Sequence, residues 1–302
     1  MDGTPQEYRL TVSTSRGPIA TEYLAAGRGS EVLLLHGTAD SAHTWRWIMP
    51  LMASAHTLYA PSLPGFGGSD KPRIDYSPAC LAAFVASFLD RLGLKRVSII
   101  GNSIGALIGV HLALRHPGRV SALALISSAG LGHEINPLIR GQIVPGTGEF
   151  LTAWCKTPLG AWQWSVGLSQ LLFAKPWSIP RAWYDRLFRM ALLPGYLEAT
   201  LLTLRAANTL WGQRESEIVL DQLHRLKMPT LVPWGDGDRI FPVRHGKSAV
   251  EGLPCGRLEV LPGCGHTAQV EQPQRVAAAL NRFLQMADAE RPEPTRAANS
   301  RA

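Results

Sequence analysis

The stretch that decides the fold is VSIIGNSIGALI, residues 97–108. The β-branched apolar run at 97–100 predicts a buried strand, and the apolar segment from 104 to about 114 has helical character. Between them, Gly101-Asn102-Ser103-Ile104-Gly105 predicts a sharp turn with a serine at its apex. Such a turn brings backbone segments very close together, so the two glycines have a steric reason. We therefore predict a strand–turn–helix unit that lifts the Ser103 hydroxyl clear of the sheet edge.

The composition is that of a folded protein with a large core. The chain has 302 residues, of which 46% are hydrophobic, and this excludes a wholly disordered chain. Uncharged apolar stretches such as 81–89 are too short to cross a bilayer, so we expect no membrane span. Residues 1–10 contain charged side chains and no apolar run, so we expect no signal peptide. The four cysteines form no CxxC pair and show no metal-ligand spacing, which favours reduced thiols in a cytoplasmic protein without a metal.

The net charge of +7 raises the question of a polyanionic partner. The basic residues are scattered, and no basic run is interleaved with aromatic residues. We therefore interpret the charge as a solvated surface and expect no nucleic acid partner. A small-molecule substrate is the expected partner, and the sequence predicts no oligomeric state.

Strands alternate with helices over most of the chain. An antiparallel hairpin is expected at 8–13 and 18–24, and a helix containing Trp45 and Leu51 is expected after the first buried strand. Further helices are expected at about 78–92, 104–115, 243–250 and 268–286, and buried strands at 31–36, 56–60, 96–100, 120–126, 230–234 and 257–261. This alternation predicts an α/β fold with a mostly parallel sheet and helices on both faces. Ligands bind at the carboxyl ends of such strands, where His36 and Ser103 are expected.

Residues 131–225 break this alternation. The segment holds six of the nine tryptophans, and prolines divide it into short helices. A structureless insertion of this length is improbable on physical grounds, so we predict a helical cap over the active rim and assign most of its tryptophans to its own core. The expected domains are a core of residues 1–130 and 226–290, the cap, and a disordered tail at 291–302.

A serine nucleophile needs a base, and the base needs an orienting acid. His266 lies in a Gly-rich loop after a late strand, and Asp238 follows the strand that ends at Trp234. The chain order Ser, Asp, His is the order used by folds with a G-x-S-x-G turn. Asp236 is the alternative acid, and Cys264 is expected to pack beneath the histidine loop. Acyl transfer by such residues needs no metal, nucleotide or flavin, so we expect no cofactor.

These motifs together resemble the α/β-hydrolase superfamily over residues 8–286. His36-Gly37 resembles its oxyanion loop, Asp238 stands four residues after Trp234 where its acid usually stands, and Gly265-His266 with Glu271 resembles its histidine loop. The resemblance implies the following roles: catalytic residues Ser103, Asp238 and His266, an oxyanion hole made by the backbone N–H groups of Thr38 and Ile104, and supporting residues His36, Gly37 and Asn102. A serine nucleophile argues against the epoxide hydrolases and haloalkane dehalogenases, which attack with an aspartate.

The substrate class is less constrained. Gly101-Asn102-Ser103 and residues 128–132 resemble the meta-cleavage-product C–C hydrolases, but Thr38-Ala39-Asp40-Ser41 and Thr267 depart from their usual pattern. The first expectation is therefore a carboxylic ester hydrolase with an apolar substrate. The alternatives are a C–C hydrolase, a non-hydrolytic cyclase, lyase or acyltransferase, and a ligand-binding protein with residual turnover.

Substrate contacts are expected from the cap. Arginines there can bind a substrate carboxylate in bidentate fashion, although Arg186 and Arg189 are helix neighbours and a solvated face is the favoured interpretation of the pair. The cap residues selected as substrate contacts are Trp154, Trp162, Trp183 and Arg189.

Overall fold

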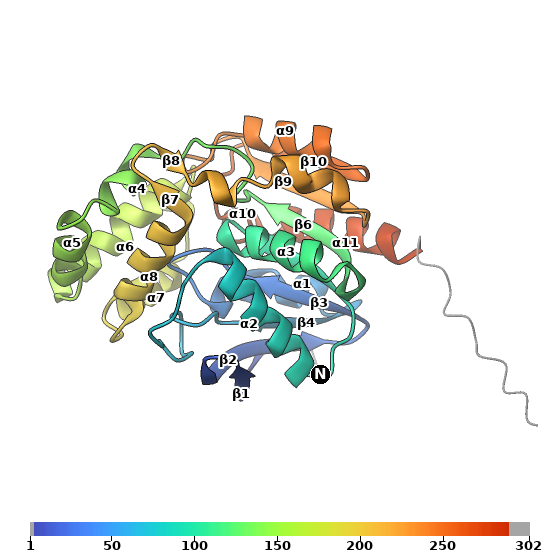
Figure 1. The fold of residues 1–302 in the computed structure, drawn as a ribbon, viewed down its shortest axis with the longest axis horizontal. Coiled ribbons are helices and arrows are strands. Elements are labelled where there is room, and N and C mark those ends of the chain that lie inside the picture. The colour runs from blue at the N-terminus through green and yellow to red at the C-terminus, as the bar shows by residue number, and fades with distance from the viewer. Residues whose placement is uncertain (1–2, 290–302) are drawn as a thin grey trace, which may run out of the picture.

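The computed structural model describes residues 3–289, so the tail expected at 291–302 lies outside the described residues. An eight-stranded sheet runs through the molecule in the order β1-β2-β4-β3-β5-β6-β9-β10 (Figure 1). The strands are β1 Gln6–Thr14, β2 Gly17–Gly27, β3 Ser30–Leu35, β4 His56–Pro61, β5 Val97–Asn102, β6 Val120–Ile126, β9 Thr230–Gly235 and β10 Gly256–Leu261. Strands β1, β2 and β4 pair antiparallel, and all pairs from β4 to β10 are parallel. This confirms the α/β fold with a mostly parallel sheet.

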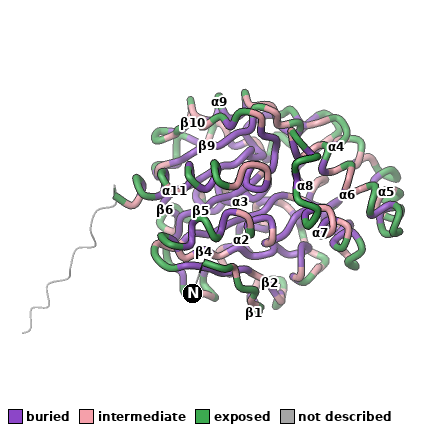
Figure 2. The backbone as a smooth tube through the Cα atoms, turned by 180° about the vertical axis from the view of Figure 1, so that it is seen from behind, coloured by how far each residue is buried: buried purple, intermediate pink, exposed green. Residues whose placement is uncertain are grey.

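The central strands are buried on both faces. In β3, Val32 and Leu34 belong to one core cluster, whereas Leu33 and Leu35 belong to the other. All four side chains are fully buried. Because side chains alternate across a strand, a strand covered on both sides shows a continuous apolar run. Figure 2 shows the buried strands enclosed by helices whose outer surfaces are exposed.

Helices cover both faces of the sheet. One core cluster receives residues from α2 (Pro78–Arg91), α3 (Ile104–Arg115) and α9 (Arg244–Gly252). The other receives residues from α1 (Met49–Met52) and α11 (Pro273–Ala289). This two-layer cover fixes the sheet, so the loops that follow its parallel strands are held at one edge.

Two expected helices were wrong in extent. The helix expected at 268–286 is divided into α10 (Ala268–Glu271) and α11, because Pro273 lacks an N–H and moves Gln272 out of the helical region. The helix expected around Trp45 is a 3-10 segment at Ala42–Trp47 followed by the single turn of α1.

Five helices are inserted between β6 and β9, within the segment expected as a cap, and we call them the helical insert. They form a group to one side of the sheet (Figure 1). Their bounds are α4 Pro137–Gln142, α5 Thr147–Cys155, α6 Pro158–Leu172, α7 Arg181–Ala191 and α8 Tyr196–Ala207. A short hairpin, β7 Asn208–Thr209 and β8 Gly212–Gln213, follows α8.

The expectation that most tryptophans of this segment form its core was wrong. Trp183 is fully buried and Trp164 is half-buried against the core. The other four are exposed: Trp154, Trp162, Trp177 and Trp211. Short helices separated by prolines leave little interior volume, so a small core excludes most of these large side chains.

No single helix within residues 3–289 is both long and apolar enough to cross a membrane. Only α7 and α8 together have that length and composition, and they are bent by 93° relative to each other.

Candidate active site

Ser103 lies at the apex of the turn between β5 and α3. Its φ of +56° is unusual for a residue with a side chain, and holding such a conformation costs on the order of 1–3 kcal/mol. The flanking glycines are required by contact. A Cβ on Gly101 would lie 2.4 Å from the backbone nitrogen of Ala106, and one on Gly105 would lie 2.3 Å from the carbonyl oxygen of Leu35. The G-x-S-x-G spacing is therefore a packing requirement of this turn.

Backbone hydrogen bonds hold the strained residue in place. The Ser103 N–H donates to the carbonyl of Ile126 at 3.0 Å, and its carbonyl accepts from Ala106 and Ala129 at 3.1 and 3.2 Å. Helix α3 starts at the next residue, Ile104, whose N–H group therefore belongs to the electropositive first turn. The sheet and the helix together fix the position of the serine hydroxyl.

Asp238 and His266 form a buried pair. His266 Nδ1 lies 2.9 Å from Asp238 Oδ2, and both side chains are nearly or fully inaccessible. Asp238 Oδ1 accepts hydrogen bonds from the N–H groups of Ile240 at 2.7 Å and Phe241 at 3.0 Å. A carboxylate accepts the Nδ1 proton, which leaves the Nε2 lone pair of His266 available as a base.

The alternative acid, Asp236, lies elsewhere. Its side chain is exposed and accepts a hydrogen bond from the N–H of Gly263 at 2.7 Å. Cys264 is fully buried beneath the histidine loop, and burial raises the pKa of its thiol, so it remains protonated.

The histidine loop is anchored to the helical insert. Glu271 accepts hydrogen bonds from the N–H groups of Gly265 at 2.6 Å and Lys175 at 2.7 Å. The N–H of His266 donates to the carbonyl of Leu172, the last residue of α6, at 2.7 Å. The insert therefore positions His266 directly, a connection that no local sequence pattern indicates.

His36 organises the loop that follows β3. Leu63 N–H donates to His36 Nε2 at 2.9 Å, so the proton resides on Nδ1, which donates to the Gly37 carbonyl at 2.8 Å. Burial lowers the pKa of His36 and keeps the imidazole neutral. On the neighbouring strand, Asn102 donates to the carbonyl of His266 at 3.0 Å and so links the serine turn to the histidine loop.

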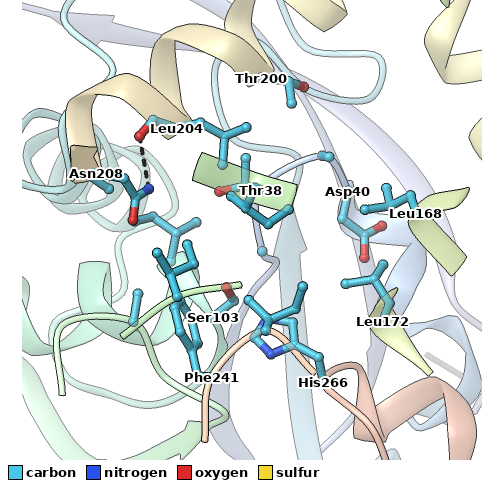
Figure 3. Close-up of a pocket in the computed structure, with 18 of the residues that line it drawn as sticks. Thr38, Asp40, Ser103, Leu168, Leu172, Thr200, Leu204, Asn208, Phe241 and His266 are labelled. Atoms are coloured by element: carbon cyan, nitrogen blue, oxygen red, sulfur yellow. Dashed lines mark hydrogen bonds between the residues drawn. The ribbon is translucent and has the colours of Figure 1, made fainter. Parts of the chain in front are cut away.

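Ser103, Asn102 and His266 line one cavity (Figure 3). Ser103 and His266 lie on its floor, with Thr38 and Ile104 beside the serine. The insert supplies the opposite wall, which is largely apolar and includes Trp164, Leu168, Leu172, Thr200 and Leu204. Among residues 3–289, no lysine or arginine lines this cavity.

Asp40, the one carboxylate among the described residues that line the cavity, is tied to the insert. Asp40 Oδ1 accepts hydrogen bonds from Arg186 of α7 at 2.7 Å and from the N–H of Ser41 at 2.8 Å. Arg186 is buried, which corrects the expectation of a solvated arginine face for this residue. It also stacks over the Trp183 ring, 4.5 Å from its centroid.

The four residues of the insert expected to contact substrate do not line the cavity. Trp154, Trp162 and Arg189 are exposed and lie on the outer faces of α5, α6 and α7. Trp183 is buried between Arg186 and Phe173. The lining residues of α8 were missed, although Thr200 and Leu204 have the i, i+4 spacing of one helix face.

Comparison with known proteins identifies the family. A family model described as the alpha/beta hydrolase fold matches residues 32–273. The chain belongs to the α/β-hydrolase family. Among relatives of this α/β-hydrolase, the dihydrolipoyllysine-residue acetyltransferase component of an acetoin cleaving system from Cupriavidus necator is 31% identical, over 88% of this chain and 67% of that protein.

Other relatives act on different substrates. A 2-hydroxy-6-oxo-6-(2'-aminophenyl)hexa-2,4-dienoic acid hydrolase from Metapseudomonas resinovorans is 28% identical, over 89% of this chain and 88% of that protein. The crystal structure of a membrane phospholipase A has a TM-score of 0.79 at 25% identity and covers 95% of this chain and 87% of its own. Similarity to these proteins therefore shows that the chain is an α/β-hydrolase, but it does not show which type of bond the chain cleaves.

Proposed function

We propose that this α/β-hydrolase cleaves carboxylic esters with an uncharged, apolar acyl group, through a Ser103–His266–Asp238 triad. The observation that carries the proposal is the strained Ser103 turn beside an imidazole whose Nδ1 is bound by a buried carboxylate, with both groups on the floor of one cavity. A serine hydroxyl is a weak nucleophile by itself, and this arrangement supplies the base that it needs.

The proposed mechanism is acyl transfer in two steps. Ser103 Oγ attacks the carbonyl carbon while His266 Nε2 takes its proton, and His266 then returns that proton to the departing alcohol. Water, deprotonated by the same imidazole, then attacks the acyl carbon. The bond from that carbon to Ser103 Oγ breaks, His266 returns the proton to Oγ, and the acid is released. The backbone N–H groups of Thr38 and Ile104 would bind the oxyanion, and one such donor is worth about 2.7–4 kcal/mol of the barrier.

The charge of the cavity wall supports an ester over an anionic diketone. A dienoic acid, the substrate class named for the Metapseudomonas relative, is an anion at neutral pH. Among the described residues, those that line the cavity include Asp40 but no lysine or arginine, and Arg186 is already paired with Asp40. An anionic substrate would therefore enter without a counter-charge. C–C hydrolysis remains the second candidate, because that relative spans most of both chains.

The helical insert would act as a cap. It supplies the upper wall of the cavity and anchors the histidine loop through Leu172 and Lys175. This arrangement encloses the acyl group and limits access of bulk water.

Labelling with a fluorophosphonate and peptide mass spectrometry tests the nucleophile. We expect the label on Ser103, and Ser103→Ala should abolish both labelling and turnover of p-nitrophenyl esters. Ser127→Ala, a buried serine at the end of β6, is the matched control. Ester turnover that survives Ser103→Ala would refute the mechanism, and turnover of a dienoate ring-cleavage product without ester turnover would favour the second candidate.

A further inference from the structure

A second cavity adjoins the first inside the helical insert. Four residues line both cavities: Gln142, Trp164, Thr200 and Leu204. Beyond them, the second cavity is enclosed by α5 and α8 and is lined mainly by apolar side chains, among them Leu151, Leu197 and Leu201. The two cavities are therefore neighbouring compartments separated only by a shared wall.

One face of α8 runs along both compartments. Its lining residues are Leu197, Thr200, Leu201, Leu204 and Ala207, with spacings of three or four residues between most neighbours. This is a single helical stripe. From the first residue to the last, the helix rises about 15 Å at 1.5 Å per residue. The two compartments therefore lie one after the other along this helix face, the first at Ser103 and the second among mainly apolar side chains.

The position of the second compartment relative to His266 indicates which part of an ester, the acyl group or the alcohol, it would face. In the proposed mechanism His266 protonates the leaving alcohol, so the alcohol must lie near the imidazole. Thr200 and Leu204 lie across the cavity from His266 (Figure 3). The compartment beyond them is therefore on the side of the acyl group.

We propose that the second compartment binds the distal part of a linear aliphatic acyl chain, so that the substrates are esters of unbranched medium-chain acids. This inference rests on the proposed function. Burial of one methylene group raises a binding constant, or kcat/KM, by about fourfold. The rate should therefore rise by about that factor per methylene until the chain fills both compartments.

The experiment compares kcat/KM for p-nitrophenyl esters from acetate to dodecanoate. Leu151, half-buried and facing the second compartment, is replaced in Leu151→Trp and in the milder Leu151→Phe. We expect both variants to retain acetate turnover and to lose at least tenfold on the longest chains. Leu159→Trp, on the exposed surface of α6, should keep the wild-type profile.

Three kinetic results and one stability result would overturn the inference. The first is a wild-type kcat/KM that does not rise with acyl length. The second is an equal loss of kcat/KM on all acyl lengths in Leu151→Phe. The third is a loss in Leu151→Phe that appears only with a series of alkyl acetates, in which the length of the alcohol is varied. A gain in Tm without a change in chain-length profile would show that the compartment is only a packing gap.

Binding without turnover separates this inference from the proposed function. In a Ser103→Ala background, calorimetry should show tighter binding of the octanoate than of the acetate ester, and Leu151→Phe should remove that difference. Failure of all ester turnover and of fluorophosphonate labelling would refute the proposed function, whereas normal labelling with no difference in binding would refute only the acyl compartment.

Discussion

At the scale of single residues, hydrogen bonding distinguishes Asp238 from Asp236, two aspartates that are only two positions apart in the sequence. Asp238 is held by two backbone N–H groups on one oxygen and by His266 on the other. Asp236 binds only a loop N–H through its exposed side chain. A carboxylate can orient a base only if its own rotation is fixed, so burial and backbone donors distinguish the two.

Asp238→Asn should lower kcat for p-nitrophenyl esters by about 10⁴-fold with little change in KM. The N–H groups of Ile240 and Phe241 retain the amide oxygen at the Oδ1 position, so the NH₂ group must face His266 Nδ1. The imidazole then carries its proton on Nε2 and cannot act as a base. Asp236→Asn is the matched control and should keep wild-type kinetics; equal losses in the two variants would contradict this assignment.

At the scale of elements, one ion pair joins the helical insert to the loop after β3. Arg186 of α7 and Asp40 are both buried, with 11% and 7% of their side chains exposed. Asp40 lies two residues after Thr38, a proposed oxyanion donor. Because removal of one partner leaves an unpaired buried charge, such pairs make the contact between two elements specific.

Arg186→Met should lower the free energy of unfolding by about 3–5 kcal/mol, as measured by urea denaturation. The loss comes from the uncompensated Asp40 carboxylate, so Arg186→Met combined with Asp40→Asn should recover part of it. Arg189→Met, at an exposed position three residues along α7, is expected to change stability by less than about 0.5 kcal/mol. A double variant no more stable than Arg186→Met would show that the pair is not coupled.

At the scale of the whole molecule, buried and half-buried imidazoles make stability depend on pH. Burial is the largest cause that lowers the pKa of His36, His43, His56 and His245 below 6.5. Between the lowered folded value and the unfolded value, the unfolded chain binds more protons. The stability that these neutral imidazoles contribute is therefore fully present above about pH 6.5 and is lost as the pH falls below that value.

The free energy of unfolding, measured in urea from about pH 8 to about pH 5, should decline below about pH 6.5. His36→Gln should show a shallower decline, because its amide oxygen can accept the Leu63 N–H without titrating. His116→Gln, at an exposed histidine, should retain the wild-type slope. An identical slope in His36→Gln would exclude His36 as a contributor.

Apolar runs and glycine positions in the sequence were sufficient to predict the strands of the sheet and the turn at Ser103. Buried strands appear as continuous apolar runs, and the glycines around Ser103 reflect contacts within a few residues or with the adjacent strand. The division at Pro273 was missed, although proline chemistry is local, because the apolar period continues through it. Local sequence therefore determined the fold class and the order of Ser103, Asp238 and His266 along the chain.

The walls of the site were decided only by tertiary structure. Which tryptophans face solvent, and that Arg186 is buried against Asp40, depend on how short helices pack across more than a hundred residues of sequence separation. A helical stripe shows which residues share a face but not what that face meets. The proposed reacting groups Ser103, Asp238 and His266 can be predicted from the sequence, because each follows the end of a strand, whereas the packing of the insert sets the shape and the charge of the cavity above them.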